Sequence, residues 1–347
     1  MANTKLLIPF FLHLMLAFSV LDANAQGLKL GFYKTSCPSA EHIVKEITKK
    51  FISRAPTLAA PLLRMHFHDC FVRALQFLFT TYEVEGEGCE GSVLLNSTKK
   101  NQAEKDAFPN LSLRGFQVVD AVKTAVEKKC PGIVSCADIL ALVAQDAVSV
   151  INGPSWSVPT GRRDGRISIA TDALNNLPSP AFNITQLKQS FASKGLSVKD
   201  LAVLSGGHTI GISHCPSFVN RLYNFTGKGD TDPTMDQNYI AHLKSKCKPT
   251  DTTTFVNLSP RSTHKFEPNY YTLVGKRRGL FQSDAALLTD STTKAYIQLQ
   301  AASKGSTFMK DFGESMVKMG QIGVLTGKSG EIRKQSMKRW HCHSGVL

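Results

Sequence analysis

Apolar residues recur along most of this chain at intervals of three and four, which is the spacing of one face of an α-helix. Two stripes have this spacing clearly: Ile43, Val44, Ile47 and Phe51, and then Val118, Val119, Val122 and Val126. Segments that alternate apolar and polar residues are few. The pattern therefore predicts an all-α protein with long loops.

Residues that favour helix ends indicate two further helices. Asn183 precedes a predicted helix that stops at Gly195. Directly afterwards, Ser197-Val-Lys-Asp200 has the form of a capping box and opens another short helix. The paired glycines 206 and 207 then end that helix. His208 is therefore expected at a helix terminus, where its ring can face a cavity.

The first residues have the pattern of a secretory signal peptide. Lys5 provides a positive charge, the apolar run 6–20 is short for a membrane span, and Ala23-Asn24-Ala25 fits a signal-peptidase site. We expect residues 1–25 to be removed, leaving a secreted chain that starts at Gln26. A buried N-terminal helix is the weaker alternative, because capping residues are absent. No later apolar run has transmembrane length, so no membrane association is expected.

Eight cysteines in an exported chain favour disulfides, but they allow about 105 pairings, and the sequence alone cannot choose among them. Zinc ligation is the poorer alternative, because no CxxC pair occurs and the Cys and His spacings do not repeat. The mature chain is long enough for one large domain or two.

The chain is strongly basic, with a formal net charge of +14. A secreted protein with this charge is expected to adhere to polyanions such as acidic polysaccharide. The secretory address and the absence of a basic module interleaved with aromatics argue against nucleic acid. Solvated surface charge without a specific partner is the alternative. Possible glycan acceptors are the five asparagines in sequons: Asn96, Asn110, Asn183, Asn224 and Asn257.

The densest group of reactive side chains is the segment Arg64-Met-His66-Phe-His68-Asp69-Cys70. On a helix, Arg64 and His68 lie four residues apart and share a face, whereas His66 points elsewhere. An arginine and a histidine in one pocket can move a proton and stabilise a forming anion. This segment alone does not distinguish such a pocket from the alternative, an ordinary helix face with no catalytic role. His208, which follows paired glycines, could be a metal ligand with close backbone access; a histidine that merely caps the helix is the alternative.

Five segments occur in a fixed order: RMHFHDC, VSCADILAL, GRRDG, LSGGHTIG and RGLFQSDAAL. Together they closely resemble the class III secretory plant peroxidases, over about Gln26 to Lys334. The resemblance implies an all-α, disulfide-stapled fold in which two domains enclose haem b. In this chain that is a single unit over 26–347, with a distal half at about 26–165 and a proximal half at about 166–310. A C-terminal segment would return to the distal half.

The resemblance assigns roles to individual side chains. His208 corresponds to the histidine that ligates the haem iron, and Asp284 to the carboxylate that accepts its other ring N–H. His68 corresponds to the distal acid and base, and Arg64 to the distal arginine. Asn110, with Glu104 behind it, corresponds to the asparagine that holds His68, which makes glycosylation of Asn110 improbable. Pro178 corresponds to a proline near the site of the aromatic donor.

The implied reaction is the oxidation of two phenolic donors by one hydrogen peroxide, giving two phenolic radicals and two waters. It would serve hydrogen peroxide catabolism and the response to oxidative stress in the cell wall or apoplast. The enzyme would be a monomer. The alternative is a catalytically impaired relative that acts as a basic, glycan-bearing protein of the cell wall.

The resemblance also implies disulfides and two calcium sites. The pairs would be Cys37–Cys130, Cys70–Cys89, Cys136–Cys342 and Cys215–Cys247. The first calcium ion would bind Asp69, Val72, Gly88, Glu90 and Ser92. The second would bind Thr209, Ser259, Ser262 and Glu267. At the second site serine or glutamate replaces the usual aspartates and Lys265 adds positive charge, so binding there is expected to be the weaker.

Two further departures distinguish this chain from the family pattern. Residues Ala74 to Glu87 interrupt a motif that otherwise runs without a break from His68 to Ser92. This insertion lengthens the loop between Cys70 and Cys89, although a longer loop costs only modestly more closure entropy. Near the C-terminus, Ser336 stands where the family has cysteine, and Cys342 follows six residues later.

Overall fold

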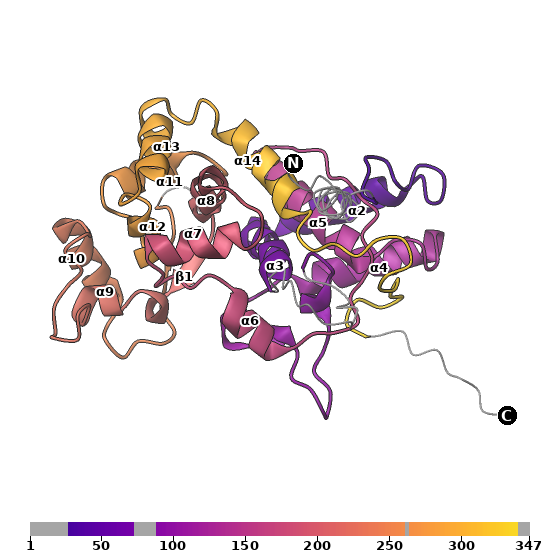
Figure 1. Cartoon of the computed structure of the whole chain (residues 1–347), viewed down its shortest axis with the longest axis horizontal. Coiled ribbons are helices and arrows are strands. Elements are labelled where there is room, and N and C mark those ends of the chain that lie inside the picture. Colours follow the sequence, from indigo (N-terminus) through magenta and orange to yellow (C-terminus); the bar gives the residue numbers. More distant parts are fainter. Residues whose placement is uncertain (1–26, 73–87, 261–263, 339–347) are drawn as a thin grey trace, which may run out of the picture.

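A computed structural model describes residues 27–72, 88–260 and 264–338, and these are predominantly helical (Figure 1). In this part of the chain the strands form one two-stranded antiparallel sheet, β1 (Ile212–His214) with β2 (Phe255–Asn257), in which Ser213 pairs with Val256. The all-α prediction is confirmed. The expected signal peptide and the insertion at 74–87 lie outside the described residues.

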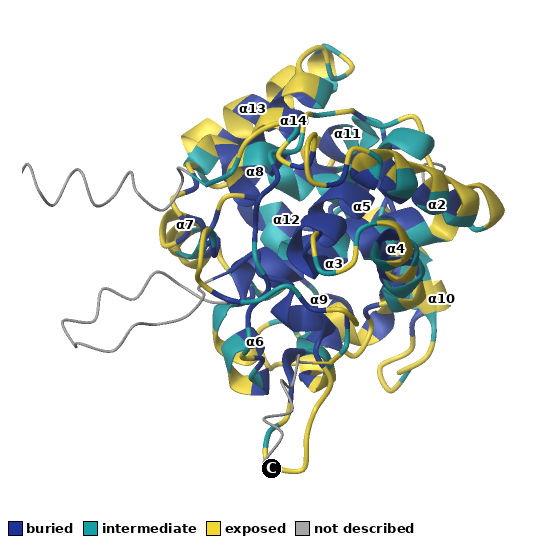
Figure 2. Ribbon diagram, turned by 90° about the vertical axis from the view of Figure 1, so that its right-hand side faces the viewer, coloured by how far each residue is buried: buried dark blue, intermediate teal, exposed yellow. Residues whose placement is uncertain are grey.

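Four helices from the first part of the chain gather on the right of Figure 1: α2 (Ala40–Arg54), α3 (Ala59–Phe71), α4 (Phe116–Lys129) and α5 (Cys136–Val150). Short 3₁₀ helices at Pro56–Leu58, Ser92–Leu94, Glu104–Asp106 and Phe108–Asn110 connect or follow them. Helix α5 is apolar on nearly all sides because α2, α3 and α4 all pack against it. Figure 2 shows this buried centre in dark blue around α3 and α5.

The remaining helices are α6 (Ala170–Asn176), α7 (Ile184–Ala192), α8 (Val198–Ser205), α9 (Asn220–Tyr223), α10 (Gln237–Lys246), α11 (Asn269–Gly275), α12 (Gln282–Ala286), α13 (Ser291–Ala302) and α14 (Phe308–Met319). Two more 3₁₀ helices span Gly206–Thr209 and Cys215–Ser217. In Figure 1, α9 to α13 lie to the left of α3. After α14 the chain forms isolated bridges to Arg163 and Asp164, which lie at the expected boundary between the halves. The boundary itself stays a prediction.

The predicted helical stripes are confirmed for α4 and displaced for α2. In α4 the buried face contains all four predicted valines. In α2 the buried positions are Ala40, Val44, Thr48 and Ile52, whereas the predicted Ile43, Ile47 and Phe51 are only partly buried. The prediction placed the centre of the stripe wrongly because it gave no weight to Ala40 and Thr48, small side chains that fit the closest helix contacts.

The predicted helix starts at Asn183 and Ser197 are confirmed. Asn183 caps α7 by accepting a hydrogen bond from the Gln186 N–H at 3.0 Å. Ser197 forms a capping box with Asp200 at the start of α8. Helix α7 ends at Ala192, before Gly195. Helix α8 ends at Ser205, next to the paired glycines as expected, and the chain continues as a 3₁₀ helix through His208.

Three disulfides join six of the described cysteines in pairs that the resemblance implied: Cys37–Cys130, Cys70–Cys89 and Cys215–Cys247. Cys136 is a buried free thiol in the structure, and its expected partner Cys342 lies outside the described residues. The Cys215–Cys247 bridge belongs to a small separate core around α9 and α10. The main core is continuous from Tyr33 to Val324 and includes residues of both expected halves.

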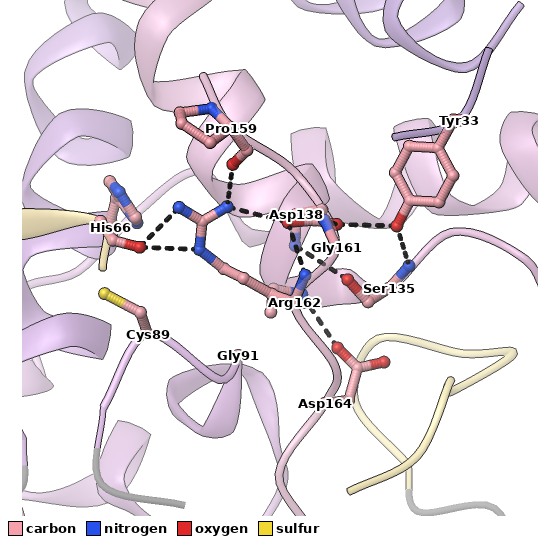
Figure 3. Close-up of polar contacts among 12 residues, drawn as sticks. Tyr33, His66, Cys89, Gly91, Ser135, Asp138, Pro159, Gly161, Arg162 and Asp164 are labelled. Atoms are coloured by element: carbon pink, nitrogen blue, oxygen red, sulfur yellow. Dashed lines mark hydrogen bonds and ion pairs between the residues drawn. The ribbon is translucent and has the colours of Figure 1, made fainter. Parts of the chain in front are cut away.

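A buried ion pair fixes the loop that joins the two parts of the chain (Figure 3). Arg162 donates to the Asp138 carboxylate of α5 at 2.8 Å and to the Gly320 carbonyl, just after α14, at 2.9 Å. Tyr33 also donates to Asp138, at 2.7 Å. Arg162 and Asp138 are both buried, and each supplies the opposite charge that the other needs, since an unpaired charge in the core would be costly. The loop, α5 and the end of α14 are thus held together.

None of the helices in the described part of the chain combines the length and apolar character that a membrane span requires.

Candidate active site

Helix α3 places Arg64 and His68 on one face, as the four-residue spacing predicted. The Arg64 Nε–H donates to His68 Nε2 at 3.1 Å. His68 is buried and Arg64 is partly buried. Burial lowers the pKa of Arg64 to about 10, so its guanidinium is still cationic at neutral pH. The pair therefore combines a fixed positive charge with an imidazole.

The other ring nitrogen of His68 is held by Asn110. His68 Nδ1 lies 2.5 Å from Asn110 Oδ1, and the Asn110 side-chain amide donates to the Glu104 main-chain carbonyl at 2.7 Å. The hydrogen bond from the Asn110 amide to Glu104 fixes the side-chain oxygen of Asn110 as the end that faces the ring. This oxygen can only accept, so His68 Nδ1 carries the proton and Nε2 is the basic nitrogen. Burial and the Arg64 charge lower the pKa of His68 well below its usual value, against the smaller opposing effect of Asn110. His68 is a neutral base over a wide pH range.

Two groups that the sequence did not indicate hold Arg64. Its Nη1 donates to Ser112 Oγ at 2.9 Å, and its Nη2 donates to the Pro109 carbonyl at 2.8 Å. Both partners flank Asn110 in the same loop. One short segment therefore orients both members of the α3 pair, and no helical spacing could have predicted it.

His66 faces away from this pair, as predicted. Its Nδ1 lies 3.7 Å from Cys70 Sγ, and burial with the nearby Arg162 charge lowers its pKa to about 3. His66, Asp69 and Cys70 bring three potential metal-binding atoms within 4.8 Å of one another. Because Cys70 is in a disulfide, this group is not a metal site.

His208 follows the two glycines and is held by Asp284 of α12. Its Nδ1 lies 2.9 Å from Asp284 Oδ1, which leaves Nε2 for a metal. The His208 side chain is 37% exposed, whereas that of Asp284 is 2% exposed. Burial acts to raise the pKa of the Asp284 carboxyl, but the adjacent His208 ring and the hydrogen bonds that the carboxylate accepts, including those from Phe281 and Tyr270, lower that pKa below its usual value. His208 thus has one ring nitrogen on a buried carboxylate, while its side chain as a whole stays more than a third exposed.

Gly206 is required for close packing rather than for a left-handed turn. Its φ is −59°, and a Cβ there would lie 2.4 Å from the Tyr271 hydroxyl oxygen. A Cβ on Gly207 would lie 3.8 Å from Leu63, the residue before Arg64. The segment that contains His208 therefore passes close to α3, the helix that contains His68.

The residues expected at the first calcium site lie around the end of α3. Asp69, Val72, Glu90 and Ser92 are buried, and the Cys89 N–H donates to the Asp69 carbonyl at 3.1 Å. Asp69 Oδ2 accepts the Gly91 N–H at 2.9 Å, and Ser92 Oγ donates to Glu104 at 3.1 Å. Burial raises the pKa of Asp69 to about 6. The backbone N–H groups of Gly91 and Val93 and the nearby Arg333 charge offset this effect of burial only in part.

The residues expected at the second calcium site are only partly described. Thr209 Oγ1 donates to the Glu267 carbonyl at 2.5 Å, and Ser259 Oγ accepts the side-chain amide of Asn269 at 2.9 Å. Ser262 lies outside the described residues. Pro178 lies two residues after the end of α6, and this helix packs against the 3₁₀ turn that contains Phe108 and Asn110.

Comparison with known proteins gives consistent results over nearly the whole chain. A family model described as peroxidase matches residues 44–303. The chain is 59% identical over 334 residues to Peroxidase 27 of Arabidopsis thaliana, an alignment that covers 96% of this chain and 98% of the relative. It is 56% identical to Peroxidase 56 of the same plant, with the same coverage of both chains. Peroxidase 1 of Oryza sativa subsp. japonica is 52% identical, again with 96% and 98% coverage.

Proposed function

Because the chain belongs to the peroxidase family, we propose that it uses hydrogen peroxide to oxidise small phenolic donors with haem b as cofactor. The observation that carries this proposal is the relay Arg64–His68–Asn110, which lies near a second histidine held by Asp284. One peroxide and two phenols would give two waters and two phenolic radicals. The role would be peroxide catabolism and the response to oxidative stress.

The residues present fit a haem. His208 has the features of an axial ligand, because Asp284 fixes one ring nitrogen and the other is accessible. When bound, the haem iron would supply the redox chemistry that no side chain provides. His208 would hold the iron.

His68 would move the proton in the peroxide reaction. Its neutral Nε2 accepts the proton from one oxygen of hydrogen peroxide and returns it to the other oxygen, which leaves as water. In the structure Arg64 Nε donates to this same nitrogen, so the substrate takes the place of that hydrogen bond. The Arg64 guanidinium then stabilises negative charge on the departing oxygen.

An exposed apolar surface beside this relay supports a phenolic donor. The Phe108 side chain is 81% exposed, and Leu111 and Leu174 are also exposed. Phe108 and Leu111 flank Asn110, while Leu174 lies on α6, which packs against that turn. An aromatic donor could stack there, with Pro178 at the end of α6 as a further contact. One electron from each of two donors completes the reaction.

Calcium would support the end of α3 that follows His68. Asp69, Glu90, Ser92 and the carbonyls of Val72 and Gly88 would hold the first ion, since hard oxygen ligands suit calcium. Asp69 and Glu90 are both fully buried, and a bound cation would offset the cost of burying their charge. At the second site Thr209, Ser259, Ser262 and Glu267 offer one carboxylate, so an ion there would bind more weakly.

We also propose secretion to the cell wall as a monomer, where acidic polysaccharide is a partner. A surface pocket of about 480 Å³ is lined by Arg163, Arg166 and Lys334 together with Glu331. Arg163 and Arg166 both donate to the Gly330 carbonyl, at 3.3 and 2.8 Å, which orients two guanidinium groups in one place. Such fixed guanidinium groups suit carboxylates.

The intact relay supports an active enzyme over the alternative of an impaired wall-binding relative. The test is the stoichiometry of turnover with the haem-loaded full chain. We expect two phenols consumed per peroxide, and loss of haem from His208→Ala. Peroxide-dependent phenol oxidation no faster than with free haem would favour the impaired relative.

A further inference from the structure

Asp284, the carboxylate that holds His208, also accepts a hydrogen bond from a buried phenol. The Tyr270 hydroxyl of α11 donates to Asp284 Oδ1 at 2.8 Å. This is the same oxygen that lies 2.9 Å from His208 Nδ1. The other oxygen, Oδ2, accepts the Phe281 N–H at 2.9 Å. Two donors, an imidazole and a phenol, therefore share one carboxylate oxygen.

Sharing an oxygen weakens each of its hydrogen bonds. An ionised carboxylate can only accept, so the phenol is necessarily the donor. The phenol withdraws electron density from Oδ1 and makes it a weaker acceptor for the His208 N–H. Asp284 and Tyr270 are each 2% exposed, so no water competes strongly at this position and the low local dielectric strengthens the effect.

The ring of Tyr270 also contacts His208 directly. The two ring centroids are 5.9 Å apart with the planes 76° to each other, and Phe281 makes a similar edge contact at 5.1 Å. The His208 ring is thus confined by aromatic edges while its N–H is directed at Oδ1. Its position and its hydrogen bond both depend on α11.

The next residue provides a natural comparison. Tyr271 is also buried, but its hydroxyl donates to the carbonyls of Ala202 and Val203 in α8, at 3.2 Å each. Loss of that hydroxyl removes a similar buried hydrogen bond from the same helix without touching Asp284. The two tyrosines therefore separate an effect on the carboxylate from a general effect on packing.

We propose that Tyr270 is a positioning residue that limits the electron donation of His208 to bound iron, by competing with the His208 N–H for Asp284 Oδ1. The inference rests on the proposed function, in which His208 is the iron ligand. A stronger Asp284–His208 hydrogen bond gives the imidazole more anionic character, which favours the higher oxidation state of iron. Tyr270 would hold this donation below its maximum.

The experiment compares Tyr270→Phe with Tyr271→Phe in the haem-loaded full chain. The measurements are the ferric/ferrous reduction potential and the iron–histidine stretching frequency of the ferrous form by resonance Raman spectroscopy. We expect Tyr270→Phe to lower the equilibrium constant for reduction by about threefold to tenfold, the larger value being about 59 mV for one electron. Its stretching frequency should rise, and Tyr271→Phe should leave both quantities near those of the wild type.

A second variant strengthens the hydrogen bond from Tyr270 to Asp284 instead of removing it, and it avoids a loss of packing. Site-specific incorporation of a ring-fluorinated tyrosine at position 270 makes the phenol a stronger donor, so the potential should rise and the frequency fall. Unchanged potential and frequency in both position-270 variants would overturn the inference while leaving haem ligation intact. Absence of a histidine–iron band in the wild type would overturn the proposed function and this inference together.

Discussion

At the residue scale, Asn110 gives the clearest test of how the neighbours of His68 act. Asn110→Leu leaves the buried His68 N–H without an acceptor and removes the group that fixes its tautomer. We expect the rate constant for peroxide reduction to fall about 10- to 100-fold with haem binding retained. Stopped-flow kinetics would measure this, with the exposed Asn175→Leu as control. An unchanged rate constant in Asn110→Leu would show that Asn110 does not orient the ring.

Asp146 of α5 predicts how stability depends on pH. Burial raises the pKa of its carboxyl to about 7, with Lys45 opposing this effect and Glu41 and Glu46 adding to it. In the unfolded chain an aspartate titrates near pH 3.9. Between about pH 4 and pH 7 the native state therefore binds more protons, and the free energy of unfolding falls as pH rises.

Asp146→Asn should remove that slope. We expect the variant to be more stable than the wild type by about 1–3 kcal/mol at pH 8, and nearly equal to it at pH 4. Thermal unfolding of the haem-free chain at both pH values is the measurement, and the exposed Glu314→Gln is the control. Equal stability of Asp146→Asn and wild type at pH 8 would mean that the native carboxyl ionises without cost.

The sequence could predict those site residues whose contacts are local in the chain. The Arg64–His68 pair followed from helical spacing, because both residues lie on one helix. The roles of Asn110 and Asp284 came only from resemblance, since their contacts join distant segments, whereas the paired glycines before His208 already indicated it as a possible metal ligand. Ser112 and Tyr270 belong to no reactive pattern. A serine or tyrosine becomes functional here only because the fold brings its hydroxyl to a charged group.

At the element scale, the capping boxes of α7 and α8 lead to a stability prediction. Ser197→Ala removes the side-chain acceptor for the Asp200 N–H at the start of α8. We expect a loss of about 1 kcal/mol in the free energy of unfolding. Asn183→Ala removes the matching cap of α7 and should cost a similar amount. Chemical denaturation of bacterially produced protein measures both. No loss in either variant would indicate that tertiary packing alone fixes these helix starts.

The elements were largely predictable because helix periodicity and caps are local signals. Helix α4 and the starts of α7 and α8 agree with the sequence pattern. The buried face of α2 did not, since Ala40 and Thr48 are buried by close contacts that hydrophobicity does not register. Gly206 follows α8 for a reason in another element, because the hydroxyl of Tyr271 leaves no room for a Cβ there.

At the scale of the whole molecule, the Arg162–Asp138 pair should be critical for folding. Arg162→Met leaves the Asp138 carboxylate buried without its cationic partner and removes the bond to Gly320. We expect a loss of about 3–5 kcal/mol in unfolding free energy, because an unpaired buried charge is costly. Denaturant unfolding measures this loss. A smaller loss in the double variant Arg162→Met with Asp138→Asn, which removes the charge but keeps an oxygen that can accept from Tyr33, would confirm the cause, whereas an equal or larger loss would contradict it.

The reaction of the haem-loaded full chain with one equivalent of hydrogen peroxide, followed by stopped-flow absorbance, tests the proposed roles of His68 and Arg64 directly. We expect a rapid change in the haem spectrum that added phenol reverses. His68→Leu should bind haem normally and react about 10²- to 10⁴-fold more slowly, while the surface variant His42→Leu should react as the wild type does. Peroxide kinetics in His68→Leu equal to those of the wild type would contradict the assignment of His68 as the proton carrier.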